Sequence, residues 1–144
     1  MDPSSESVFV SLGSFAEMLS DPEGYNPERL KSLSSLVPAP LSSFIEAMLS
    51  SDEDVMREHL SDLEDYAAEV NSIQAWFNLG RLAHRLFFHQ AAIGYYNNAA
   101  DLAEIRRDDS LPGILLSLGG LYGEEEDWDR ACQCYERALA AMDG

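Results

Sequence analysis

Cysteine and basic residues are both scarce in this sequence, and each shortage excludes a class of protein. The 144 residues include two cysteines, Cys132 and Cys134. Residues two apart on a helix point about 200° away from each other, so these two cannot pair locally. We therefore expect reduced thiols in a cytoplasmic protein. Nine basic residues stand against 26 acidic ones, giving a net charge of −17. This charge repels phosphate backbones and anionic lipids, so we expect no nucleic-acid and no membrane binding.

The sequence also lacks the signatures of enzymes and of secreted or membrane proteins. No apolar run approaches the roughly 20 residues of a membrane span, and the N-terminus carries acids where a secretory signal needs bases. There is no glycine-rich phosphate loop and no nucleophile elbow. His84 and His89 do not share a helical face, and no cysteine lies at metal-ligand spacing from them. The acidic run at 124–127 lacks the ligand order of a calcium loop and is interpreted as solvated. We expect no enzymatic activity, no catalytic residue, no metal and no cofactor.

Apolar residues make up 46% of the chain and recur at helical spacing, which predicts an all-α protein. Asn26 and Pro27 form a good helix start, as do Ser51 or Asp52 before two further acids. No five-residue stretch shows the alternation of a strand. The expected helices are 8–19, 27–36, 41–49, 52–70, 73–86, 90–106, 112–125 and 128–142.

The second half of the chain repeats itself with a period of 39 residues. The recurring positions are Leu79, Gly80, Ala83, Ala92, Tyr96 and Ala99, matched by Leu118, Gly119, Tyr122, Ala131, Tyr135 and Ala138. Glycine inside a helix costs about 1 kcal/mol relative to alanine, so close helix packing must offset it. We expect the small residues at helix crossings, and the two tyrosines between one helix pair and the next.

This pattern resembles the tetratricopeptide repeat (TPR), whose signature is an aromatic, Leu-Gly and an aromatic in one helix, then Ala, aromatic and Ala in the next. Trp76 and Tyr122 match signature aromatics, whereas Ala83 and Leu115 depart from them. The period exceeds the usual 34 residues by five, which we place around 106–110. The resemblance implies a right-handed superhelix of antiparallel helix pairs. It implies TPR repeats at 73–111 and 112–144 and an N-terminal helical cap in 1–72, with 41–70 as a degenerate repeat or part of the cap.

The resemblance also implies a concave groove lined by the first helix of each repeat. Its positions in the first repeat are Phe77, Asn78, Arg81, His84 and Arg85, and in the second Leu116, Ser117, Gly120, Gly123 and Glu124. Helical spacing separately places 77, 81, 84 and 85 on one face. Asn78 could bind a peptide backbone, and the arginines a carboxylate, which resembles part of the carboxylate clamp of some TPR domains. The second repeat lacks the basic residues of a full clamp, and a solvated polar face is the other interpretation.

The expected function is therefore a non-catalytic interaction module, or scaffold, that binds a protein or peptide in the groove. Phe77, Phe87 and Phe88 are either partner anchors or core residues, and Trp76 and Trp128 fit core and turn packing. No polar capping helix follows the last repeat, as solenoids usually require. We expect either a fragment of a longer array or a covered outer face. A homodimer through the uncapped C-terminal repeat, or stacking of copies into a scaffold, is the alternative.

Overall fold

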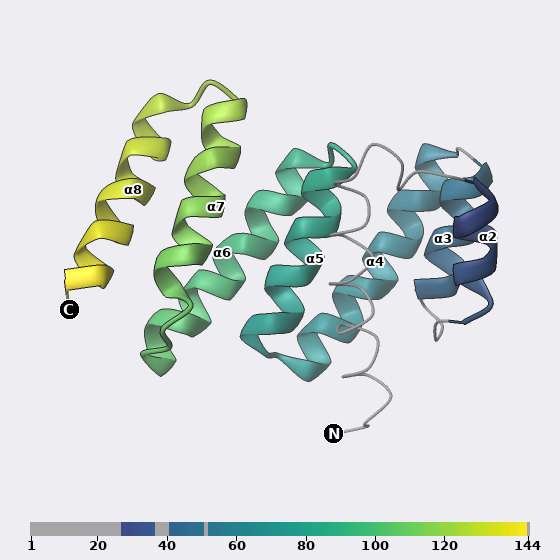
Figure 1. The fold of residues 1–144 in the computed structure, drawn as a ribbon, viewed down its shortest axis with the longest axis horizontal. Coiled ribbons are helices and arrows are strands. Elements are labelled where there is room, and N and C mark those ends of the chain that lie inside the picture. The colour runs from purple at the N-terminus through teal and green to yellow at the C-terminus, as the bar shows by residue number, and fades with distance from the viewer. Residues whose placement is uncertain (1–26, 37–40, 51, 144) are drawn as a thin grey trace. The chain divides into compact units, whose positions relative to one another are not determined.

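The computed structural model describes residues 27–36, 41–50 and 52–143, and within them every regular element is a helix. The elements are α2 (Pro27–Ser34), α3 (Leu41–Ser50), α4 (Glu53–Val70), α5 (Ile73–Arg85), α6 (His89–Arg106), α7 (Leu111–Glu124) and α8 (Trp128–Asp143) (Figure 1). The all-α prediction is confirmed for these residues. The helix expected at 8–19 lies outside the described residues. Over the described ranges, no helix has both the length and the apolar character needed to cross a membrane.

The chain divides into two compact units, Met1–Asn71 and Ser72–Gly144. In the first unit, α3 packs against both α2 and α4, around a core of Leu30, Leu41, Phe44, Ile45 and Leu63. Helix α4 begins after Asp52, whose carboxylate accepts hydrogen bonds from the amides of Asp54 and Val55. This is the N-cap that the acidic start signal predicts.

The second unit consists of two helical hairpins, α5–α6 (the first hairpin) and α7–α8 (the second hairpin), with α6 packed against α7 (Figure 1). The hairpin turns have the same backbone geometry. Phe87 and Glu126 adopt positive φ angles of 65° and 61°. In each turn the next amide bonds back to a carbonyl at 2.9 Å, Phe88 to Ala83 and Asp127 to Tyr122. Each pair of equivalent residues is 39 apart, so the sequence period is also a period of the backbone.

The glycine of each Leu-Gly pair lies under a tyrosine ring of the same hairpin. A Cβ atom added at Gly80 would lie 2.6 Å from Cδ1 of Tyr96, and one at Gly119 would lie 2.7 Å from Cε1 of Tyr135. At either distance the ring would have to shift to admit a side chain, so glycine allows the close approach of the ring. The tyrosines therefore pack within their own hairpins, a contact that the sequence analysis did not assign to them.

Candidate functional site: a cavity between α5, α6 and α7

A cavity of about 260 Å³ opens on the second unit where three helices meet. It is lined by Phe77, Arg81, His84 and Arg85 of α5, Tyr96 of α6, and Leu116, Ser117, Gly120 and Glu124 of α7. Four of the five residues predicted for the first repeat are in this set, as are four of the five equivalent positions of the second. Gly123 is not among them.

Helical geometry explains why these side chains meet. On α5, the residues at 77, 81, 84 and 85 follow the spacing that places side chains on one helical face. The facing residues of α7 are small, and a Cβ atom added at Gly120 would meet nothing within 4 Å. Ser117 and Gly120 therefore leave open the space that bulkier side chains would fill.

Asn78 lies elsewhere, and its placement corrects the prediction that it faces a groove. Its side chain is 2% exposed, and it does not line the cavity. No buried side-chain nitrogen or oxygen of the described residues lacks a hydrogen-bond partner, so its amide is used inside the protein. One residue step turns a helix by about 100°, which takes position 78 off the face that carries Phe77 and Arg81.

The two arginines give the cavity its positive charge. Arg81 is half-buried and Arg85 is exposed. Neither forms an ion pair with another described residue, whereas Arg130 and Arg137 are bound to Asp127 and Glu104 at 3.2 and 3.1 Å. Two arginines beside a cavity, with no carboxylate partner among the described residues, could bind an anionic ligand.

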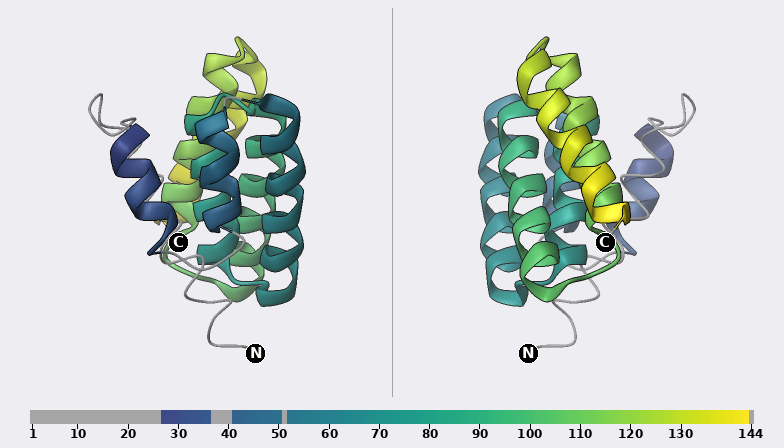
Figure 2. Two further views of the ribbon diagram at one scale, coloured as in Figure 1. Left: turned by 90° about the vertical axis from the view of Figure 1, so that its right-hand side faces the viewer. Right: turned by 90° about the vertical axis from the view of Figure 1, so that its left-hand side faces the viewer.

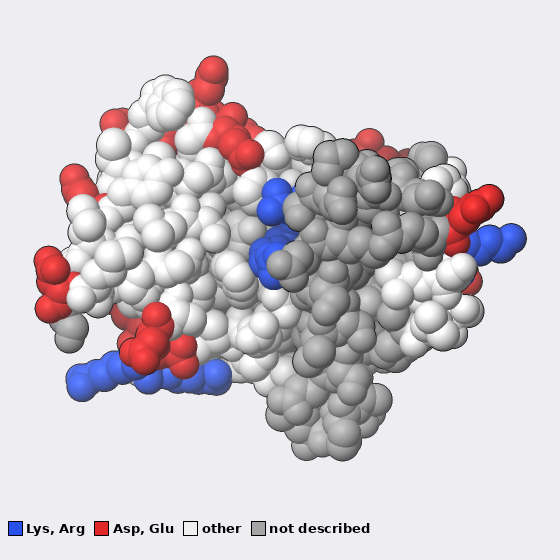
Figure 3. Space-filling model, viewed as in Figure 1, with Lys and Arg blue, Asp and Glu red and all other residues white. Residues whose placement is uncertain are grey.

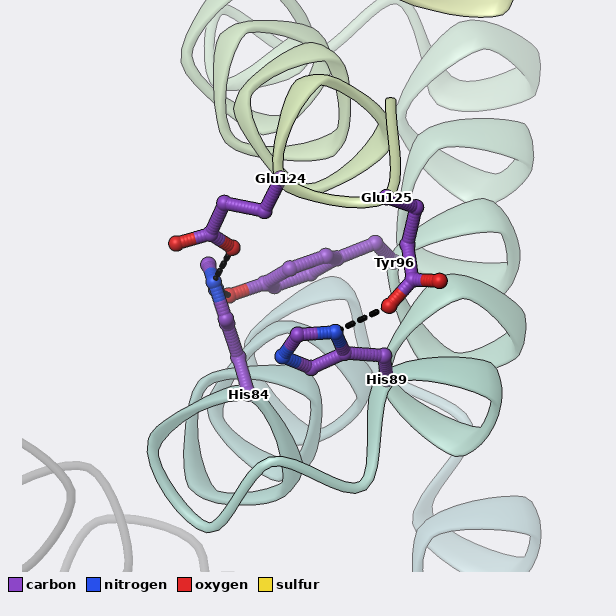
Figure 4. Close-up of polar contacts among 5 residues, drawn as sticks. All are labelled: His84, His89, Tyr96, Glu124 and Glu125. Atoms are coloured by element: carbon purple, nitrogen blue, oxygen red, sulfur yellow. Dashed lines mark hydrogen bonds and ion pairs between the residues drawn. The ribbon is translucent and has the colours of Figure 1, made fainter. Parts of the chain in front are cut away.

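Tyr96 lines the cavity, and its hydroxyl is linked through His84 to Glu124. Its burial raises the pKa of the hydroxyl to about 12, against the opposing effect of Arg81 and Arg85. The hydroxyl lies 3.3 Å from Nδ1 of His84, and Nε2 of His84 lies 2.5 Å from Oε2 of Glu124 (Figure 4). A carboxylate only accepts hydrogen bonds, so Nε2 donates; in the neutral ring Nδ1 then accepts from the tyrosine hydroxyl.

A second histidine–glutamate contact joins the same ends of the hairpins. Nδ1 of His89 donates to Oε1 of Glu125 (Figure 4). The partners are 40 residues apart in the first contact and 36 in the second, and the sequence analysis missed both. The acidic run at 124–127 is solvated in the interpretation from sequence, whereas in the structure two of its members bind histidines. The 39-residue period was the available signal, because it places the end of α5 beside the end of α7.

The aromatic residues divide between core and surface. Trp76 is buried and stacks on Tyr95, with 6.0 Å between the ring centroids, and Phe88 is also buried. The ring of Phe77 packs against that of Tyr96, with 5.5 Å between the ring centroids, and Phe77 lines the cavity. Phe87, by contrast, is 81% exposed. Trp128, assigned to core or turn packing from the sequence, is also largely exposed, because no element of its unit covers that side of α8.

The cavity therefore combines three chemical features. Phe77 and Leu116 offer apolar contact, Arg81 and Arg85 offer charged donors, and the wall of α7 is small and open. Among the residues that the structure describes, no cluster of three or more His, Cys, Asp or Glu side chains could hold a metal ion. The arrangement is suited to recognising an acidic group carried next to an apolar one.

A scan against protein-family models, a search of the curated proteins and a search of the solved structures each returned no match to this chain.

Proposed function

We propose that this chain is a non-catalytic interaction module that binds an acidic peptide segment of a partner protein, in the manner of a TPR groove. The observation that carries the proposal is the pair Arg81 and Arg85 at the mouth of a cavity with no carboxylate partner among the described residues. Support from the repeat comes second, because fold alone does not determine function.

The ligand chemistry follows from the lining. A guanidinium group binds a carboxylate through two parallel hydrogen bonds, so each arginine fits an aspartate, a glutamate or a C-terminal carboxylate. Glu124 is the acidic side chain among the described lining residues, and its contact with His84 keeps it engaged within the protein. Phe77 and Leu116 then accept an apolar side chain next to the acidic group.

Selection from a random peptide library against the full chain tests this proposal. We expect the selected peptides to be enriched in Asp or Glu beside an apolar residue. Their affinity for an Arg81→Gln, Arg85→Gln variant should fall at least about tenfold, the loss of roughly 1.4 kcal/mol or more in binding free energy. Fluorescence anisotropy of a labelled selected peptide measures both affinities.

The matched control removes two arginines that do not line the cavity. Arg106→Gln, Arg107→Gln changes the net charge by the same amount and should leave the affinity within about twofold. If both variants lose affinity equally, the peptide responds to the overall charge and the cavity is not its site. Asn78 is left unchanged in these variants. Because it is buried, its substitution would change the stability of the fold and not only the affinity for the peptide.

Self-assembly through the C-terminal repeat is the alternative function, and exposed apolar residues on α8 favour it. Sedimentation equilibrium separates the two. An interaction module keeps its monomer mass at every concentration until a ligand is added. A self-assembling segment shows a mass that rises with concentration.

A further inference from the structure

The outer face of α8 carries the same positions that α6 buries in the first hairpin. On α6, Ala100 and Ala103 are fully buried and α7 packs against the helix. The equivalent residues of α8, 39 positions later, are Leu139 and Met142, which are 62% and 55% exposed. Within the second unit, the right-hand view of Figure 2 shows α8 in front with no helix over it.

These exposed residues form one continuous apolar stripe. Its members are Trp128, Cys132, Tyr135, Leu139 and Met142, separated alternately by four and three residues. That spacing places all five on one face of a helix. All five are exposed, although large apolar side chains cluster on a surface mainly where something binds.

The open border of the stripe is acidic. Asp129, Glu136 and Asp143 each follow a stripe residue by one position, so they lie about 100° round the helix from it. Arg130 and Arg137 lie on the opposite side and are already paired with acids. In Figure 3, side chains other than Lys, Arg, Asp and Glu cover most of the region where α7 and α8 lie in Figure 1. Acidic side chains lie along its outer edge, and basic side chains lie beside acidic ones at its lower end.

We propose that the α8 stripe binds a basic amphipathic helix of a partner protein. The equivalence of the two hairpins indicates that the ligand is a helix, because the same face of α6 is covered by a helix. The acidic border supplies its charge, because lysine or arginine beside the partner's apolar stripe would face Asp129, Glu136 and Asp143. The stripe is separate from the cavity of α5, α6 and α7, so this proposal does not rest on the proposed function.

Charge also argues against two other occupants. In an antiparallel two-fold pair of α8 helices, Glu136 would face its own copy and Asp129 would face Asp143, which is repulsive. The chain's own residues 1–26 contain five acidic residues and no basic one, so they are repelled by the same border. Leu139 and Met142 are larger than the alanines of α6, and the flexible methionine can adapt to a partner surface.

The probe is a synthetic peptide of 16 residues, the length of α8, with leucines at alternating three- and four-residue spacing and lysines elsewhere. A scrambled peptide of the same composition carries no leucine stripe. Cys132 lies within the stripe and is exposed, whereas Cys134 is buried, and burial raises the pKa of the Cys134 thiol. Maleimide labelling of the native chain therefore reports on the stripe through Cys132, with Cys134 as the internal reference.

We expect saturating stripe peptide to slow the modification of Cys132 at least about tenfold, and the scrambled peptide to have little effect. Leu139→Ser, Met142→Ser should weaken peptide binding at least about tenfold. Ile105→Ser, which also replaces an exposed aliphatic residue, should leave it unchanged. Asp129→Asn, Glu136→Gln should weaken binding mainly at low salt. Circular dichroism checks that each variant is folded.

Equal protection of Cys132 by the two peptides, or unchanged affinity in the Leu139→Ser, Met142→Ser variant, would overturn the proposal. A second copy as the occupant would overturn it too. That outcome would appear as a concentration-dependent mass of the native chain that Leu139→Ser, Met142→Ser reduces to the monomer.

Discussion

The first and second hairpins share one backbone geometry, but α6 buries a face that α8 leaves exposed. Their turns repeat the same positive φ angles and the same hydrogen bonds, and each places a tyrosine ring over a helix glycine. On α6, which packs against α7, Ala100 and Ala103 are buried. The equivalent residues of α8 are Leu139 and Met142, and both are exposed. Equivalent positions are therefore buried in one hairpin and exposed in the other.

The largest expected effect comes from placing a charge at equivalent positions of the two helices. Ala100 is fully buried and Leu139 is largely exposed. Ala100→Asp would bury an unpaired carboxylate and should lower the free energy of unfolding by at least about 3 kcal/mol. Leu139→Asp should cost less than about 1 kcal/mol, most of it helix propensity.

Urea denaturation followed by circular dichroism measures both values. Equal losses for Ala100→Asp and Leu139→Asp would show that the two faces have the same environment and would remove the contrast between the hairpins.

A pH titration of stability should isolate Tyr96. Its pKa is raised from 10.0 to about 12 by burial. The neutral hydroxyl is favoured in the folded state, so its stabilisation is fully present below pH 10 and is lost as the pH rises towards 12. The loss over this window is roughly 2 kcal/mol.

The comparison uses Tyr96→Phe, which has no ionisable hydroxyl and should lose less stability over the same pH range. Tyr135→Phe changes an exposed residue and should keep the alkaline loss of the native chain. An identical alkaline slope for the native chain and Tyr96→Phe would contradict the burial of this hydroxyl.

The two helix glycines give a smaller contrast. At Gly80 an added methyl group meets the ring of buried Tyr96, whereas at Gly119 it meets the ring of Tyr135, which is partly exposed and can move. Gly80→Ala should cost about 1–2 kcal/mol after the gain in helix propensity. Gly119→Ala should change stability by less than about 0.5 kcal/mol. Thermal melts of the pair test this, and a larger loss at Gly119 would refute it.

The smallest contrast concerns the first residues of the two hairpins. Ser72 caps α5, and its hydroxyl accepts a hydrogen bond from the amide of Ala75 at 3.0 Å. Ser110 precedes α7 without a side-chain cap. Ser72→Ala should cost about 1 kcal/mol, and Ser110→Ala should cost only a few tenths. Chemical denaturation of both variants measures the difference, and equal costs would show that the cap contributes nothing.

The sequence predicted the helices of the second unit to within one residue at each end. The signals there are the helical spacing of the apolar residues and the pattern that repeats after 39 residues. The structure adds how two helices are bounded: Ser72 caps α5, and Arg107 ends α6 in the left-handed conformation. In α2 the expected end was two residues late, because helical propensity continues through Ser35 and Leu36 although the helix ends at Ser34.

The candidate site was predicted in part. Helical spacing found the α5 side of the cavity, and the repeat found the α7 side. Neither the spacing nor the repeat could show that Asn78 is buried. At the edge of a helical face, a single residue step decides whether a side chain lines the cavity or enters the core. Tyr96 was assigned to packing alone, although its hydroxyl reaches His84. The contacts of His84 and His89 with Glu124 and Glu125 need the three-dimensional stacking of hairpins, which local spacing does not contain.

In the proposed function, Arg81 and Arg85 hold the acidic group of a bound peptide. Arginine side-chain NMR spectra of the native chain, recorded while a selected acidic peptide is added, test it most directly. The chain contains eight arginines, and Nε–H signals report on each one separately. We expect the signals of Arg81 and Arg85 to shift with peptide concentration while those of Arg106 and Arg107 stay in place. Saturable binding that leaves Arg81 and Arg85 unshifted would contradict it.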